Sequence, residues 1–136
     1  MKSSIQHLLV KGALQSASMK IAIIEESAIV AQDMMETLSA LAQSVVCLSF
    51  DTIQAARAGY EVAGESPNLV VVAADRDGVV QGDSDDLIWL QRQKVIAVDS
   101  RLQKGSSWRF LSKPFAEDQL VSAAEALLFW EDEAAE

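Results

Sequence analysis

Short apolar runs alternate with longer stretches of helical periodicity along most of the chain. Each apolar run is continuous enough to be a strand buried on both faces, whereas the stretches between the runs are apolar on one side only. The expected strands are 20–25, 44–50, 68–74, 94–100 and 108–112, and the expected helices are 28–42, about 51–62, 84–93 and about 116–130. This alternation predicts an α/β domain with a doubly wound, five-stranded parallel sheet.

The helical stretches also carry signals for their buried sides and their ends. Asp51 or Thr52 could cap the second helix, and Ser84, Asp85 and Asp86 suit the positive N-terminal end of the third. The residues expected to face inward are Ile29, Met34, Met35, Leu38 and Leu41 in the first helix and Leu120, Ala124, Leu127 and Leu128 in the last.

Two segments lie outside this alternation. Residues 1–18 are expected to be an N-terminal helical extension, because Ile5, Leu8, Leu9 and Leu14 recur at near-helical spacing within 3–15. The extension could dock on the domain or on a second copy of the chain. Residues 131–136 form an acidic tail, so 19–130 is expected to be the single folded domain.

Composition narrows the classes of partner. The 136 residues include 20 acids and 11 bases, giving a net charge of −9. Such a surface repels nucleic-acid backbones and anionic membranes, so neither is an expected partner. The one cysteine, Cys47, excludes an intrachain disulfide, and no run reaches the ~20 apolar residues that span a bilayer. We therefore expect a cytoplasmic protein.

Chemistry-bearing residues gather where the strands end, because the carboxyl ends of parallel strands share one edge of the sheet. Carboxylates there suit Mg²⁺, and a lysine pairs with a phosphoryl charge. The residues at the strand ends are Glu25 and Glu26, then Ala73 and Asp75, then Asp99 and Ser100, and finally Lys113. The set is typical of phosphoryl transfer, except that the central strand ends in alanine.

From about Met19 to Leu128 the chain resembles the receiver domain of two-component response regulators. The matching stretches are IAIIEESAIV, SPNLVVVAAD, KVIAVDS and FLSKPF, of which FLSKPF is the most specific. The resemblance implies a flavodoxin-like sheet with strand order 2-1-3-4-5. Only RLQKGSS separates the fourth strand's end from the fifth strand's start, so the fourth helix is expected to be reduced to about one turn.

The resemblance assigns a role to each position and shows where this chain departs from the pattern. Glu25 and Glu26 fall on the metal-binding acid pair, Ala73 on the phosphoacceptor aspartate, and Asp99 on the threonine or serine that follows the phosphate. Phe110 and Lys113 keep the aromatic and lysine switch positions. Because alanine has no side-chain oxygen, we expect a pseudo-receiver that keeps the fold and has lost the standard phosphoacceptor.

Four acids leave alternatives open. Asp75 is either a displaced phosphoacceptor or a solvated loop acid. Glu25 and Glu26 either bind Mg²⁺ weakly or pair with Lys113, so the expected cofactor is none or weakly bound Mg²⁺. Asp99 either stands in for the missing phosphate charge near Lys113 or is a solvated acid at a strand end.

The expected function is a stand-alone, non-enzymatic module of two-component phosphorelay signalling that acts through protein contacts. The resemblance implies a histidine kinase, a phosphotransfer protein or a regulator as partner. Trp108 and Phe129-Trp130 suggest an apolar contact surface, which could also support a homodimer. The runner-up is a receiver that is phosphorylated on an unusual acid such as Asp75. A small acid-activated enzyme is disfavoured, because His7 is the one histidine and no nucleophile–base pair is evident.

Overall fold

The structure, a computed structural model, describes residues 18–101 and 108–130. The predicted N-terminal helix, the reduced helix after the fourth strand and the acidic tail fall outside these residues. Within them, no helix has both the length and the apolar character needed to cross a bilayer.

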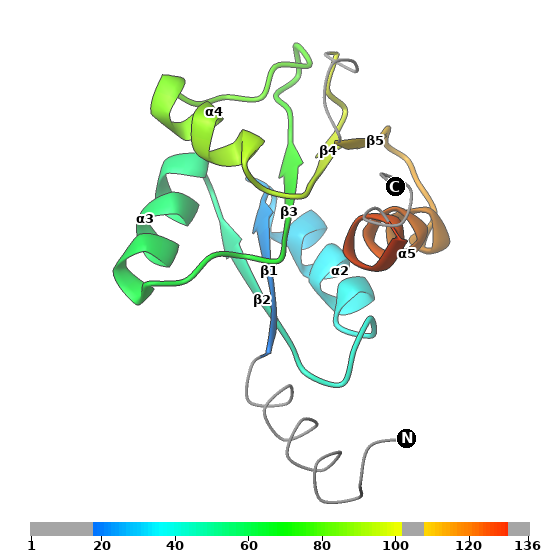
Figure 1. The fold of residues 1–136 in the computed structure, drawn as a ribbon. Coiled ribbons are helices and arrows are strands. Elements are labelled where there is room, and N and C mark those ends of the chain that lie inside the picture. Colours follow the sequence, from blue (N-terminus) through cyan, green and yellow to red (C-terminus); the bar gives the residue numbers. More distant parts are fainter. Residues whose placement is uncertain (1–17, 102–107, 131–136) are drawn as a thin grey trace, which may run out of the picture.

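The described chain folds into one parallel sheet with helices on both faces (Figure 1). The strands are β1 (Met19–Ile24), β2 (Val45–Phe50), β3 (Leu69–Ala73), β4 (Val95–Val98) and β5 (Arg109–Leu111). The helices are α2 (Ala28–Leu38), α3 (Ile53–Ala63), α4 (Ser84–Gln91) and α5 (Glu117–Glu125), which continues as the π-helical turn Ala126–Trp130. The strand order β2-β1-β3-β4-β5, with every pairing parallel, confirms the predicted flavodoxin-like architecture.

Each face of the sheet has its own hydrophobic core. Successive side chains of a strand point to opposite faces, so Ile21 and Ile23 pack under α2 and α5 while Ala22 and Ile24 pack under α3 and α4. The central strand β3 contributes to both cores and is almost completely buried until Ala73. This double burial explains why the strands read as continuous apolar runs rather than as alternating ones.

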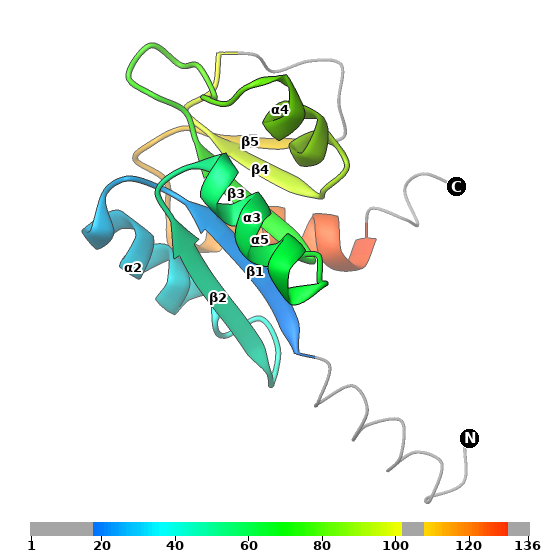
Figure 2. The same ribbon diagram turned by 90° about the vertical axis from the view of Figure 1, so that its left-hand side faces the viewer.

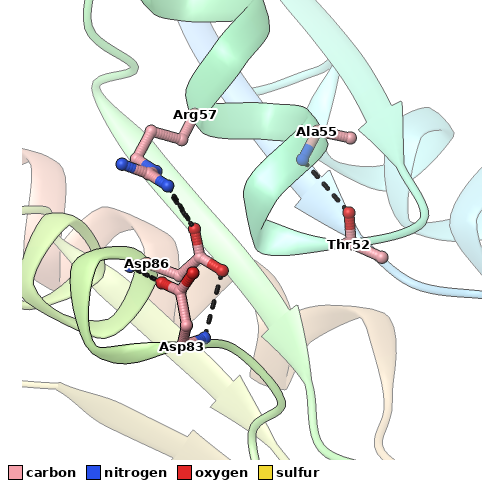
Figure 3. Close-up of polar contacts among 5 residues, drawn as sticks. All are labelled: Thr52, Ala55, Arg57, Asp83 and Asp86. Atoms are coloured by element: carbon pink, nitrogen blue, oxygen red, sulfur yellow. Dashed lines mark hydrogen bonds and ion pairs between the residues drawn. The ribbon is translucent and has the colours of Figure 1, made fainter.

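Side-chain caps define where the helices begin. The hydroxyl of Thr52 accepts a hydrogen bond from the backbone N–H of Ala55 at 3.1 Å and so caps α3, as predicted for Asp51 or Thr52. For α4 the cap is Asp83, one residue before the predicted acidic turn. Asp83 and Asp86 each accept the other's backbone N–H, which satisfies two of the free donors at the helix start (Figure 3).

Two predictions about α2 are wrong. The helix ends at Leu38 rather than at residue 42, since the hydroxyl and the backbone N–H of Ser39 both donate to the Met35 carbonyl. Ile29 does not face the sheet, because its side chain is 77% exposed. The buried residues Ala31, Met34 and Leu38 define the inner side of α2, and Ile29 lies two residues, or about 200°, away from Ala31 around the helix.

A buried ion pair joins α3 to α4 (Figure 3). The Nε and a terminal nitrogen of Arg57 lie 3.0 and 2.9 Å from Oδ1 of Asp86. The Asp86 side chain is only 7% exposed, and its other oxygen holds the start of α4. The pair therefore fixes the distance between the two helices that cover this face of the sheet.

Candidate functional site

A small pocket opens where β1 and β3 end. Its volume is about 130 Å³, and its lining includes Glu25, Glu26, Asp51, Ala73 and Asp75. The strand register brings these residues together, because β1 pairs with β3 and Ala73 pairs with Val98 at the end of β4. The structure thus places Glu25, Glu26 and Asp75 around one cavity with Ala73, whereas Asp99 and Lys113 are not among its lining residues.

Ala73 brings only a methyl group to this pocket. It is half-buried, and it packs against the core under α2 and α5. Within residues 18–101 and 108–130, no three His, Cys, Asp or Glu side chains lie close enough to hold a metal ion together. In this part of the chain, the Mg²⁺ site considered for Glu25 and Glu26 therefore lacks a third His, Cys, Asp or Glu side chain.

Glu25 is paired on both of its oxygens. Oε1 lies 3.0 Å from Nζ of Lys113, and Oε2 accepts the backbone N–H of Ser27 at 3.0 Å. The side chain is only 8% exposed, so an unpaired carboxylate here would be costly. This geometry agrees with the alternative in which the acid pair remains as a partner for Lys113.

Asp99 holds the backbone after β5. Its Oδ1 accepts the backbone N–H of Lys113 at 2.8 Å, and its own N–H donates to the carbonyl of Leu111 at 2.8 Å. Its φ of 59° is left-handed, a conformation that aspartate tolerates better than most residues. The carboxylate therefore meets the backbone of Lys113, while the ammonium of Lys113 meets Glu25.

Asp75 is turned into its own loop. Oδ1 accepts the backbone N–H groups of Asp77 and Val79, both at 2.9 Å, and Oδ2 accepts from Nε2 of Gln81 at 2.6 Å. These bonds lower the pKa of Asp75, with Val79 as the largest cause, followed by Gln81, and Arg101 adds a favourable charge. The carboxylate is thus held by its own loop rather than simply solvated.

The loop that Asp75 holds is also fastened to the chain after β4. Gly78 has a φ of 80°, and its carbonyl accepts the backbone N–H of Arg101 at 2.9 Å. A side chain at Gly78 would overlap the Arg101 side chain, so only glycine fits at this turn.

Acid should open this loop. The folded-state pKa of Asp75 lies below its ordinary value of 3.8, so the stabilisation is present above that value and is lost as the pH falls through the folded-state pKa. We expect hydrogen exchange at the Asp77 and Val79 amides, corrected for intrinsic rates, to accelerate in that range. An Asp75→Asn variant should lose this pH dependence, and the neighbouring Asp77→Asn control should keep it. Equal pH profiles for all three proteins would contradict the role of Asp75.

Phe110, predicted to be the aromatic switch position, is not among the residues that line the small pocket. Phe110 is half-buried and packs against the core under α3 and α4, with its ring 6.3 Å from that of Trp108. Both rings line a shallow depression of about 430 Å³ between β5 and the end of α5. Trp108 is half-buried and Phe129 is exposed, so both side chains remain accessible for the apolar contact surface that the sequence suggested. The side chain of Trp130 lies outside the described part.

A larger groove, which the sequence reasoning missed, lies between α2 and the segment that follows β5. Its volume is about 710 Å³. Its apolar lining comes from Val30, Met34, Phe115 and Leu120, and its acidic lining from Asp33, Glu36 and Glu117. Lys113, which pairs with Glu25 of the small pocket, also lines the groove. The sequence does show two acids, Asp33 and Glu36, beside the apolar Met34 in α2. The groove could not be predicted from them, because its other wall comes from α5, which only the fold places next to α2.

Comparison with protein-family models finds no match, and comparison with curated proteins finds none either. Among solved structures, the receiver domain of the response regulator PhyR from Erythrobacter litoralis is similar, with a TM-score of 0.62 and 20% identity over 83% of this chain and 92% of that one. The N-terminal domain of a response regulator, sensory box and GGDEF protein from Carboxydothermus hydrogenoformans gives a TM-score of 0.63, with 16% identity over 86% and 99% of the two chains. The protein has the receiver fold.

Another similar structure belongs to a longer chain. PhyR from Bartonella quintana, described as an anti-anti-sigma factor, gives a TM-score of 0.63 and 22% identity over 96% of this chain and 56% of that one. At these identities the likeness extends to the fold alone.

Proposed function

We propose that the protein is a non-enzymatic receiver-type module of two-component signalling that works through protein contacts without phosphorylation at the standard position. The observation that carries the proposal is the methyl group of Ala73 in the pocket where a phosphoacceptor would need an oxygen. No side-chain atom of Ala73 can form the acyl phosphate bond.

The neighbouring groups support the same conclusion. Glu25 is engaged by Lys113 and Ser27, Asp99 by the Lys113 backbone, and Asp75 by its own loop. A lysine that pairs with a buried carboxylate is already neutralised, so it needs no phosphoryl group to hold it in place. The strand ends are thus tied together by protein contacts alone.

The groove beside Lys113 is the surface that we propose for the protein partner. An apolar lining with acidic residues fits an amphipathic helix whose apolar side chains are flanked by lysine or arginine. A helix of a histidine kinase, a phosphotransfer protein or another regulator would meet this description. The structural likeness to response-regulator receivers supports a partner of this class.

The test combines a phosphodonor with a binding measurement. The partner is captured from lysate of the source cells, identified and purified, and its affinity is measured with and without a small acyl phosphate and Mg²⁺. We expect no phosphoryl mass on the intact protein and the same affinity in both conditions. The double variant Asp33→Lys/Glu36→Lys should weaken binding, whereas Glu61→Lys/Asp85→Lys, which reverses two exposed acids on α3 and α4, should not.

A stable phosphorylated species would contradict the proposal. If its mass increment vanished in Asp75→Asn, the displaced-acceptor alternative would hold instead. Equal binding by both charge-reversed proteins would show that the groove is not the contact surface. That result would not affect the proposal that the protein is not phosphorylated at the standard position.

A further inference from the structure

The edge strand β2 exposes apolar side chains on one face of the sheet. Val46 and Leu48 are 42% and 46% exposed, although both lie inside a regular strand. Parallel register pairs them with Lys20 and Ala22 of β1, and Ala22 belongs to the core under α3 and α4. Val46 and Leu48 therefore lie on the face of the sheet that α3 covers elsewhere.

The helix α3 does not reach these two residues. Its inward side chains Ile53, Ala56 and Tyr60 join the core beside Ala22 and Val70. Tyr60 meets β2 through Phe50, with ring centroids 6.0 Å apart. Figure 2 shows α3 in front of the middle of the sheet, with no described helix in front of the first part of β2.

One polar atom on this side is also unsatisfied. Among the described residues, the Tyr60 hydroxyl is a buried side-chain oxygen without a hydrogen-bond partner. A buried hydroxyl of this kind costs free energy until a donor or an acceptor reaches it. The α3 face near β2 therefore lacks both apolar cover and a polar contact.

We propose that residues 1–17 of the same chain cover this surface as an amphipathic helix. The chain enters the described region directly beside the start of β2, because the Met19 N–H donates to the Ser44 carbonyl at 3.0 Å and the hydroxyls of Ser18 and Ser44 lie 2.8 Å apart. Whatever precedes Ser18 therefore begins next to Val45 and Val46.

Length and pattern match the strand. Ile5, Leu8 and Leu9 have the i, i+3, i+4 spacing of one helix face. A helix over 3–15 would be about 20 Å long, which equals the length of the six-residue strand β2 at about 3.3 Å per residue. Residues 16–18 leave a linker of the length that commonly reverses the chain between two elements.

Charge favours the same placement. Residues 1–17 contain Lys2 and Lys11 and no acid, in a chain of net charge −9. On the domain, Glu65 pairs with Lys20 at 3.7 Å, and Lys20 is the register partner of Val46. Glu61, which is exposed, lies one turn earlier on α3. In the proposed placement, the basic residues 1–17 would thus lie close to Glu61 and Glu65, which border the exposed Val46 and Leu48.

A disulfide test measures the docking directly. In the full chain with Cys47→Ser, the pair Leu8→Cys and Leu48→Cys is oxidised, and the products are separated on a non-reducing gel and identified by mass spectrometry. The control pair is Leu8→Cys with Val62→Cys, a position on α3 that is 90% exposed. We expect a monomeric, internally linked product that forms at least about tenfold faster for the first pair, because docking raises the effective concentration of the two thiols.

Linked dimers as the main product would overturn the proposal in favour of a second copy as the occupant. Equal rates for the two pairs would overturn it as well.

A second measurement avoids the crosslink. The rate of thiol alkylation is compared in full chains that carry Cys47→Ser and Leu48→Cys. Adding Leu8→Asp/Leu9→Asp should raise the rate about fivefold, since docking lowers accessibility in proportion to the docked population. The matched Ser3→Asp/His7→Asp chain, with the new acids on the opposite helical side, should behave like the parent. Equal rates in all three chains would contradict docking.

Discussion

Replacing Ala73 with aspartate is expected to make the stability of the protein depend on magnesium. The new carboxylate would enter the pocket that Glu25, Glu26 and Asp75 already line. Without metal, like charges in a partly buried pocket destabilise the fold. At a Mg²⁺ concentration ten times the dissociation constant, binding returns about 1.4 kcal/mol, which raises the melting temperature by about 5 °C in a domain of this size.

Two proteins serve as controls in that titration, which is read by calorimetry or by far-ultraviolet circular dichroism. Ala73→Asn adds the same volume without a charge, and neither it nor the unchanged protein should respond to Mg²⁺. A response of the unchanged protein as large as that of Ala73→Asp would mean that Glu25 and Glu26 already form a metal site. No response from Ala73→Asp would mean that Lys113 withholds Glu25 from the metal.

Removal of the Asp86 carboxylate is expected to lower the free energy of unfolding by about 3 kcal/mol, the lower end of the range for breaking a buried ion pair. The Asp86→Ala variant leaves the Arg57 guanidinium without its partner between α3 and α4. It also removes the acceptor for the backbone N–H of Asp83 at the start of α4. The measurement is urea unfolding followed by fluorescence of the tryptophans.

The adjacent acid gives the matched control. Asp85 lies in the same first turn of α4 but is exposed, so Asp85→Ala should cost less than about 1 kcal/mol, the value of one charge at a helix end. The double variant Arg57→Met/Asp86→Leu should recover most of the loss, because no buried charge is left alone. Equal effects of Asp85→Ala and Asp86→Ala would contradict a buried pair.

The strands and helix starts could be predicted because their signals are local. The apolar run from Leu69 to Ala73 and the cap at Thr52 are each contained within a few residues. Ile29 was misplaced because spacing alone does not say which side of a helix faces the sheet. That side became certain only when Ala31, Met34 and Leu38 packed against the core.

The site was predictable to the extent that it depends on strand ends. The sequence placed Ala73, Glu25 and Lys113 at one edge, and it offered the Glu25–Lys113 pair as an alternative. The hydrogen bonds of Asp75 within its own loop depend on Val79 and Gln81, and the DRDG stretch was a usable sign of such a turn. The pair of Arg57 with Asp86, 29 residues apart, depends on how α3 and α4 pack, which no local pattern records.

The left-handed backbone at Asp99 also limits how this chain could evolve. A threonine at that position would place a branched β-carbon in a conformation that such residues avoid, at a cost of about 1–2 kcal/mol. It would also release the backbone of Lys113, which the present carboxylate binds. A hydroxyl there would need a compensating change in the chain between Asp99 and Lys113. An aspartate at position 73 alone would therefore add a carboxylate at the pocket without a hydroxyl at position 99.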